Sequence, residues 1–427
     1  MRRRILISAL IAATLPTGLL AGCSAKGPSA APTTYVTAKN AADITVSSAA
    51  YQQAEIGSEA FGLALLRSLG DAAGGGSVVI SPQTLVNLLT MILPGAQGRT
   101  AMEMSDALGY AGLSASAAAG ALGKLNATAR ADANQGSNTL DESSDVWTAS
   151  GLKLAQSYLA TLDGAFGAGV HQTDFAADPR GSAQAIDNLV SQETHGYIPQ
   201  LFSPDSLDAT TRLVLTDAVY LNAAWAAPFD PNETSPSAFH PAEGSPTQLS
   251  MMNRIGEYDY ASGSGWQLVE LPYSGGKTAM DILLPGPGSG SLAALRDGLS
   301  ATSLNSMLGS MTRQNVTLTI PKFTTAWSPS NLISTLTQLG LGDLFANADL
   351  TGMTADHEQL GVSQFVEKAY VAVGEKGTVA AAAAGGAIST SARVATGVTF
   401  DADHPFLYLV RDLSTGQILF AGQFAGH

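Results

Sequence analysis

The side chains that could carry out chemistry are few in this chain and are not arranged for catalysis. No serine has glycine both two residues before and two residues after it, the pattern of a hydrolase nucleophile. The six histidines are scattered, without the H-E-x-x-H spacing of a zinc protease, and Asp356-His357-Glu358 is typical of a solvated loop. No glycine-rich phosphate loop joins a predicted strand to a helix. We therefore expect no enzyme activity, no metal site and no cofactor.

Cys23 is the one reactive side chain that the sequence places in a recognisable context. It is the only cysteine of the 427 residues, so the rest of the chain can form no disulfide. Three arginines and an apolar run at residues 5–15 come before it, as in a signal peptide. Leu20-Ala21-Gly22-Cys23 resembles a bacterial lipobox, whose cysteine is lipidated and becomes the new N-terminus. An ordinary cleaved signal with an incidental cysteine is the alternative.

The domain organisation follows from composition. We expect residues 1–23 to be a lipoprotein signal peptide and residues 24–50, rich in Ala, Ser, Thr and Pro, to be a flexible tether. Residues 51–427 contain no further linker and are predicted to be one domain. The net charge of −14 argues against nucleic acid and anionic lipid as partners. The protein is thus expected to be exported and held at the cell envelope surface by its lipid alone, or secreted if the anchor is not used.

The most unusual stretch begins at Glu375. Before it, residues 365–373 are rich in β-branched and aromatic side chains and predict a strand. Glu375-Lys376-Gly377-Thr378-Val379 and five alanines follow, then two glycines and a polar segment. Such small side chains suit a loop that later slides into a crowded sheet. Because strand side chains alternate between faces, every second residue from Thr378 to Ala384 would point to the same side. A low-complexity linker is the simpler alternative.

A second segment, near the C-terminus, indicates what the stretch after Glu375 does. Residues 400–410, together with the E-K-G-T-x-A-A-A-A pattern before them, closely resemble the signature of the serpin family. Further motifs resemble the family in the same order along the chain, at residues 80–82, 95–100, 145–147, 174–175, 185–198, 213–230, 251–252, 270–273, 283–285 and 321–323. The resemblance covers residues 51–427. It implies an α+β fold with three β-sheets, about nine helices and an exposed reactive-centre loop, approximately residues 377–398.

The resemblance also implies a function. A serpin is a suicide-substrate inhibitor: a serine protease, or in some cases a cysteine protease, cleaves the loop and is trapped as a covalent acyl-enzyme when the loop inserts into the central sheet. We expect a monomer that forms this complex. A non-inhibitory serpin, acting as a binding or chaperone-like surface protein, is the alternative. The intact small-residue hinge argues against that alternative; it comprises Glu375, Gly377, Thr378, Ala380, Ala381, Ala382 and Ala383.

Two counts locate the bond that the protease would cleave. In the family the residue before this bond commonly lies sixteen positions after the hinge glutamate, and in longer loops nine before the signature phenylalanine, Phe400. Both counts give Ser391, so Ser391–Ala392 is the predicted reactive bond. A small residue there suits elastase-like or subtilisin-like proteases. Thr390 remains an alternative, as does Arg393, which would suit a trypsin-like protease.

One region departs from the family pattern. Beneath the place where the sheet opens, the family usually pairs an asparagine with a histidine, and the corresponding positions here are Asp217 and Glu367. Ser81 and Thr84 belong to the same region, with Thr84 at a position that is usually a second serine. Two buried carboxylates at short range cannot both ionise cheaply, so we expect a coupled pair with a raised pKa. Sequence drift that has repacked the region is the alternative.

Overall fold

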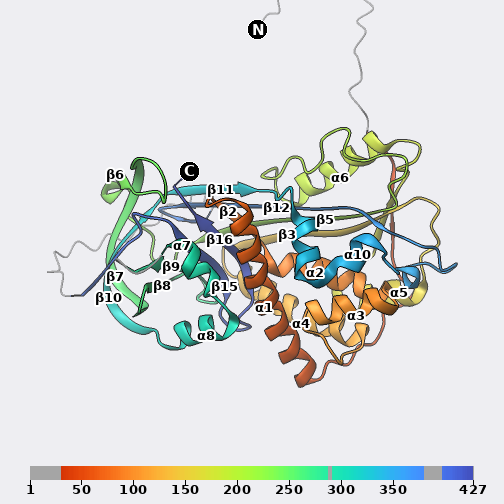
Figure 1. Ribbon diagram of the computed structural model, residues 1–427, viewed down its shortest axis with the longest axis horizontal. Helices are drawn as coiled ribbons and strands as arrows, with labels where there is room; N and C mark the ends of the chain where they lie inside the picture. The colour runs from red at the N-terminus through yellow and green to blue at the C-terminus, as the bar shows by residue number, and fades with distance from the viewer. Residues whose placement is uncertain (1–29, 287–290, 379–396, 427) are drawn as a thin grey trace, which may run out of the picture.

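The computed structural model describes residues 30–286, 291–378 and 397–426 (Figure 1). Its largest feature is a pair of sheets. The first contains seven strands among the described residues, and its order is not the chain order because several connections cross over. Across this sheet the strands are β1 (Thr33–Val36), β4 (Val170–Thr173), β3 (Thr139–Ala149), β5 (Leu213–Ala224), β13 (Gly377–Thr378), β12 (Val362–Gly374) and β11 (Phe323–Trp327).

The second sheet forms the other end of the molecule. Its order is β14 (Val398–Asp401), β10 (Thr312–Pro321), β7 (Thr247–Gly263), β8 (Trp266–Pro272), β9 (Thr278–Pro285), β15 (Phe406–Asp412), β16 (Ile418–Phe424) and β2 (Val78–Ile80), and β6 (Ser235–Phe239) pairs with β7. The described strands therefore group into two sheets rather than three. The reason is β7, a 17-residue strand that pairs with β6 and β10 over most of its length and with β8 at its end, so that all these strands belong to one sheet.

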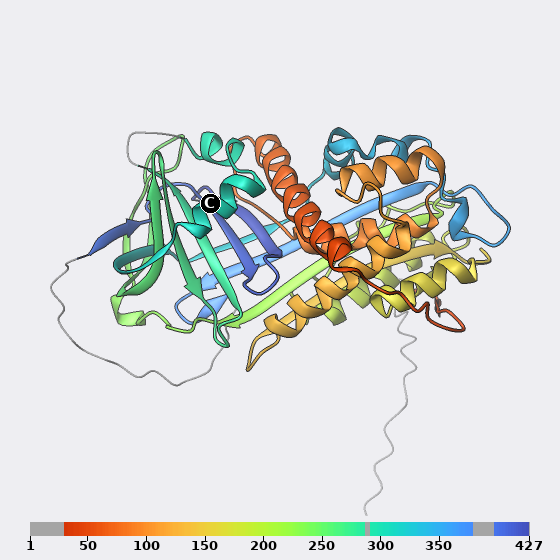
Figure 2. The ribbon, with the colours of Figure 1, turned by 90° about the horizontal axis from the view of Figure 1, so that it is seen from below.

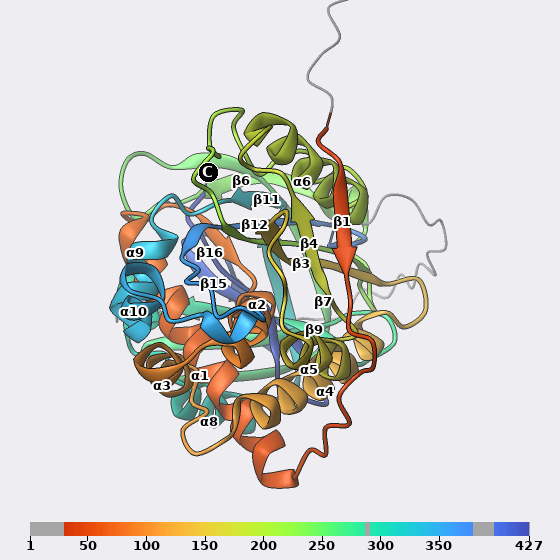
Figure 3. The same cartoon turned by 90° about the vertical axis from the view of Figure 1, so that its right-hand side faces the viewer.

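Helices cover both faces of the seven-stranded sheet. In Figures 1 and 3, α6 lies on one face and the group α1 to α5 on the other. The helices of the described residues are α1 (Ser48–Ala72), α2 (Pro82–Ile92), α3 (Gly98–Ala107), α4 (Ala115–Ala133), α5 (Gln156–Phe166), α6 (Pro179–Glu193), α7 (Leu292–Asp297), α8 (Ala301–Gly309), α9 (Leu332–Leu336) and α10 (Gly342–Ala346). This mixed arrangement confirms the predicted α+β class.

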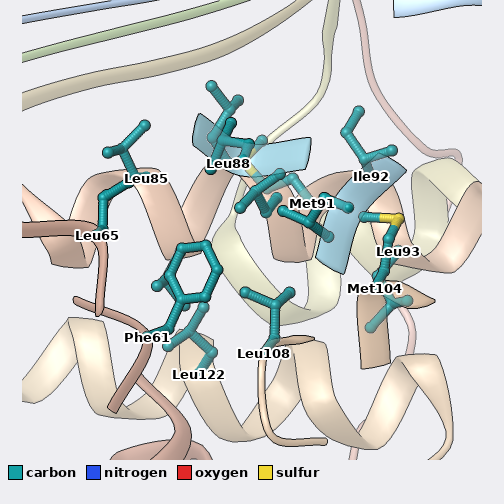
Figure 4. Close-up of a cluster of buried hydrophobic side chains, with 14 of the residues drawn as sticks. Phe61, Leu65, Leu85, Leu88, Met91, Ile92, Leu93, Met104, Leu108 and Leu122 are labelled. Carbon is teal, nitrogen blue, oxygen red and sulfur yellow. The ribbon is translucent and has the colours of Figure 1, made fainter. Parts of the chain in front are cut away.

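The main core lies between the helices and the sheets. Figure 4 shows Phe61 and Leu65 of α1 packed with Leu85 and Leu88 of α2, and all four side chains are buried. Apolar residues at helical spacing between residues 58 and 69 form the middle of the buried face of α1, which extends further at both ends. Helix α2 begins where it does because the Ser81 side chain accepts a hydrogen bond from the backbone N–H of Thr84, an N-cap that fixes the position of both residues.

The predicted flexible tether is wrong for the residues after Pro32. Strand β1 pairs antiparallel with β4 from Thr33 to Val36, and α1 already begins at Ser48 (Figure 3). Composition misled because Ala, Ser and Thr are also compatible with an extended segment that lies on a sheet edge. The missed signal is the alternation at residues 42–47, where Ala42, Ile44 and Val46 are partly buried while the residues between them are exposed.

Candidate functional site

The candidate site is the seam between β5 and β12. These two long strands pair in parallel, with residues 213–220 of β5 beside residues 362–370 of β12. Figure 2 shows them crossing much of the length of the molecule. At one end of the seam the two-residue strand β13 lies between them: Thr378 is opposite Ala223 on β5 and opposite Val373 on β12. The sheet is therefore already separated at the end where the predicted hinge enters.

Gly377 makes this entry possible. Its φ of 149° lies in the region that favours glycine. A Cβ at this position would stand 2.0 Å from the carbonyl oxygen of Ala223. Any side chain at residue 377 would thus push β13 away from β5.

Thr378 is the first hinge side chain inside the sheet. It is fully buried, and its hydroxyl shares a hydrogen bond of 2.5 Å with the phenol of Tyr273. Burial raises the pKa of Tyr273, so the phenol stays protonated and can donate. The Tyr273 ring stacks on Trp225, with 4.6 Å between the ring centroids. The first hinge side chain inside the sheet therefore contacts one of two stacked aromatic side chains, and a charged residue in its buried position would be costly.

The turn that reverses the chain before β13 is tied to the segment after β5. The Trp225 indole donates to the carbonyl of Gly374 at 2.9 Å, and the Trp225 backbone N–H donates to the carbonyl of Lys376 at 2.9 Å. The Glu375 carboxylate pairs with Lys322 at 2.9 Å. Partial burial favours the neutral acid. The hydrogen bond from Lys322 and several weaker contributions together outweigh burial, so the pKa of Glu375 is lowered. Glu375 is thus ionised and holds the turn.

Further along the seam, the structure brings the four predicted residues of the sheet-opening region together. Asp217 and Glu367 are directly opposite each other on β5 and β12, and both are buried. The Ser81 backbone N–H donates to Glu367 Oε1 at 2.8 Å, and the Thr84 hydroxyl donates to Asp217 Oδ2 at 2.5 Å. Ser144 of β3, which the sequence did not single out, donates to Asp217 Oδ1 at 2.8 Å.

The surroundings of this carboxylate pair favour bound protons. Burial raises the pKa of Asp217 to about 7 although the hydroxyls of Thr84 and Ser144 act against it, and the charges of Glu142 and Asp145 make smaller contributions in the same direction as burial. Burial, and next the charge of Asp217, raises the pKa of Glu367 well above its ordinary value. Lys368 does not compensate the pair, since its ammonium donates to the carbonyl of Gln200 instead. Glu367 Oε2 is buried and has no hydrogen-bond partner in the described part of the chain.

Several predicted residues cannot be placed in this geometry. Cys23, the hinge alanines Ala380 to Ala383, and the bond candidates Thr390, Ser391, Ala392 and Arg393 lie outside the described residues. The partners that sequence reasoning missed, Ser144 and the phenol of Tyr273, meet the site from positions far away in the chain. Only the pairing of the strands shows those contacts, so no local pattern could have found them.

The described ranges contain no cluster of three or more His, Cys, Asp or Glu side chains that could hold a metal ion. Within the same ranges, no helix is both long enough and apolar enough to cross a bilayer.

Known proteins share both the sequence and this architecture. A family model described as "Serpin (serine protease inhibitor)" matches residues 57–426. Iripin-2 of Ixodes ricinus is 33% identical over 367 residues, which cover 85% of this chain and 91% of that protein. Plasminogen activator inhibitor 1 of Neovison vison is 31% identical over 370 residues, covering 85% of this chain and 90% of that protein.

A solved structure shows the same fold. The crystal structure titled native protease nexin-1 with heparin superposes with a TM-score of 0.77 at 28% identity, covering 88% of this chain and 100% of that one. The family match, the curated relatives and the shared fold agree with one another. This chain therefore belongs to the serpin family of serine protease inhibitors.

Proposed function

We propose that this protein inhibits its target proteases as a suicide substrate, by inserting its cleaved reactive-centre loop between β5 and β12. The observation that carries this proposal is β13, where residues 377 and 378 already pair with both strands. An inserted loop would continue β13 in the same direction along the seam.

The register of β13 predicts where each loop residue would lie after insertion. If both pairings of Thr378 continue for six more residues, residue 384 comes level with Asp217 on one side and with Glu367 on the other. The two independent pairings give the same result. Every second residue from Thr378 would then face the core side, and the sequence supplies alanine at positions 380, 382 and 384. Small side chains there can pass the buried aromatic residues and the carboxylate pair.

The same register supports the predicted bond. Continued for ten residues, the inserted strand reaches the level of Leu213, where β5 begins. At about 3.3 Å per residue, that path is roughly 33 Å long. A protease attached at Ser391 would then sit just beyond the far end of the sheet, whereas attachment several residues earlier would leave it over the sheet. Thr390 and Arg393 satisfy this condition nearly as well.

The chemistry and the energy both favour trapping. The protease serine attacks the Ser391 carbonyl, the Ser391–Ala392 bond breaks, Ala392 leaves with a new amino group, and Ser391 remains as an ester on the protease.

Insertion of ten residues between two strands forms about twenty ladder hydrogen bonds and breaks about eight. At ~1 kcal/mol each, the net gain is on the order of 10 kcal/mol. That gain is comparable to the stability of a whole domain, so the uncleaved fold is held by a kinetic barrier.

The proposed targets are elastase-like or subtilisin-like serine proteases, because their shallow pockets accept a residue as small as Ser391. Incubation with a panel of purified proteases should give a complex that survives denaturing gel electrophoresis. Intact mass spectrometry should show a released fragment that begins at Ala392. Ser391→Asp should abolish the complex with these proteases, whereas Arg393→Ala should leave it nearly unchanged.

Two other results would redirect the proposal. A stable complex with a trypsin-like protease and a fragment beginning at Val394 would move the reactive bond to Arg393. Cleavage without a covalent complex across the whole panel would favour the alternative, a non-inhibitory serpin that serves as a surface binding protein. We further propose that the protein acts outside the cytoplasm, attached through lipid on Cys23.

A further inference from the structure

Residues 31–47, which contain β1 and a bend at residues 39–40, lead into α1, and we call them the N-terminal clasp. It runs down the outer edge of the seven-stranded sheet and then over α5 and α4 before α1 begins (Figure 3). Its first hydrogen bond joins the Ala31 N–H to the carbonyl of Gly181 in α6, at 2.8 Å. Its later bonds join the Lys39 N–H to the side chain of Gln156 at 3.2 Å and the Ala42 N–H to the carbonyl of Ala160 at 2.8 Å. The clasp thus connects α6, the edge of the sheet at β4, and α5 on the opposite face.

The surface beneath the clasp is shaped for it by glycines on three different elements. A Cβ on Gly164 of α5 would stand 2.3 Å from the Ala42 carbonyl oxygen, and one on Gly120 of α4 would stand 2.4 Å from the Ile44 side chain. A Cβ on Gly169, just before β4, would stand 2.3 Å from the Val36 carbonyl oxygen. Since real Cβ atoms essentially never approach so closely, alanine at any of the three would displace the clasp.

An aromatic stack fastens the clasp to the sheet. The Tyr35 hydroxyl accepts a hydrogen bond of 2.6 Å from the Gly169 N–H, and its ring lies 4.6 Å from the ring of His171. His171 in turn stacks on the buried Trp147 of β3 at 4.3 Å, and its Nε2 lies 3.3 Å from Asp145. The stack therefore reaches across β4 to the next strand.

The strand that the clasp covers has only a short pairing with its inner neighbour. Strand β4 pairs with β3 over only three residues, whereas β5 and β12 pair from residue 213 to residue 220. Without β1, β4 would be a four-residue edge strand held by that short pairing. Opening of the sheet could then separate either of two strand pairs, β5 from β12 at the seam or β4 from β3 at the outer edge.

We propose that the N-terminal clasp binds the β4–β3–β5 half of the sheet and helices α4 to α6 into one rigid body, so that loop insertion opens the seam instead of loosening the outer edge. The proposal rests on the proposed inhibitory function. It follows from position: each partner of the clasp named above belongs to the β5 side of the seam. Insertion can therefore move the clasp together with its partners without breaking its contacts.

A pair of glycine variants tests the proposal in the full-length chain. Alanine in place of a helical glycine is ordinarily stabilising. We expect Gly164→Ala instead to destabilise the fold and to increase amide hydrogen exchange in Gly169 and residues 170–173, whereas Gly309→Ala, which meets no atom within 4 Å, should not. Mixed with a target protease, Gly164→Ala should give about threefold less covalent complex and correspondingly more free cleaved inhibitor. A chain that begins at Ser47, and so keeps the N-cap of α1, should behave in the same way.

The outcomes separate the clasp from the proposed function. Faster exchange in β4 with an unchanged yield of complex would overturn the proposal, because the clasp would then stabilise the edge without taking part in insertion. If the parent forms no complex with any protease, the inhibitory function fails. In that case the test of the clasp is the rate of loop insertion after cleavage, followed as the rise in melting temperature with time. Equal rates in the parent and in Gly164→Ala would overturn the proposal for the clasp.

Discussion

At the scale of single residues, the carboxylate pair distinguishes this chain from the usual family pattern. Asp217 and Glu367 stand opposite each other on the two strands that insertion must separate, and their donors come from α2 and β3. An inserted strand would place residue 384 between them. Protonation of the pair therefore changes the stability of the native seam more than the stability of the inserted form, in which the two carboxylates no longer face each other.

The pair predicts that the native fold loses stability as the pH rises. Both folded-state pKa values lie above the ordinary values of 3.8 and 4.5, so the protons bound by the pair stabilise the fold fully below about pH 4. This stabilisation is lost as the pH rises through about 7 for Asp217 and through the raised pKa of Glu367. We expect Glu367→Gln to flatten the fall in unfolding free energy between pH 5 and pH 8, by an amount on the order of a few kcal/mol.

Urea unfolding at a series of pH values measures this effect. Glu243→Gln, on an exposed loop, is the matched control and should follow the parent. The same pH dependence in Glu367→Gln and in the parent would show that the pair is not coupled.

At the scale of elements, the hinge prediction rests on local information, the order of strand, glycine and small residues around Gly377. The structure places Gly377 and Thr378 in β13 between β5 and β12, and the hinge alanines lie outside the described residues. The predictions that failed are those that depend on strand pairing between residues far apart in the chain. The long pairings of β7 within one sheet and the pairing of residues 33–36 with β4 depend on which strands meet in space. Neither follows from the residues of one segment alone.

The hinge predicts that Thr378→Arg converts the inhibitor into a substrate. Thr378 is fully buried against Tyr273, so an arginine there would place an unpaired charge inside the sheet at a cost of several kcal/mol. The protease would still cleave the loop, but insertion would stall and the ester would hydrolyse. Denaturing gels with a target protease should show the cleaved form and little complex. Thr378→Val, close in size, and Thr312→Arg, on an exposed part of β10, should both retain the complex. A normal yield of complex in Thr378→Arg would contradict the hinge assignment.

At the scale of the whole molecule, the clasp determines how an N-terminal anchor would be joined to the inhibitor. If Cys23 carries lipid, only seven residues separate it from Ala31, whose N–H is bonded to α6. The eight Cα–Cα steps from Cys23 to Ala31 span at most about 29 Å. The β1 and α6 end of the domain would therefore lie close to the membrane, which differs from the long tether that composition suggested. The net charge of −14 gives the domain no attraction of its own to anionic lipid.

The anchor predicts a clean separation between attachment and inhibition. Cys23→Ser should prevent lipidation, move the protein from the membrane fraction to the soluble fraction, and remove the mass of the acyl chains from the mature chain. The rate of complex formation in solution should stay the same, because the contacts of the clasp described above come from residues 31–47. Fractionation of cells and intact mass spectrometry measure the first two effects, and a protease titration measures the third. An unchanged mass together with unchanged fractionation would rule out lipidation at Cys23. A slower rate in the soluble variant would show instead that residues before the clasp contribute to insertion.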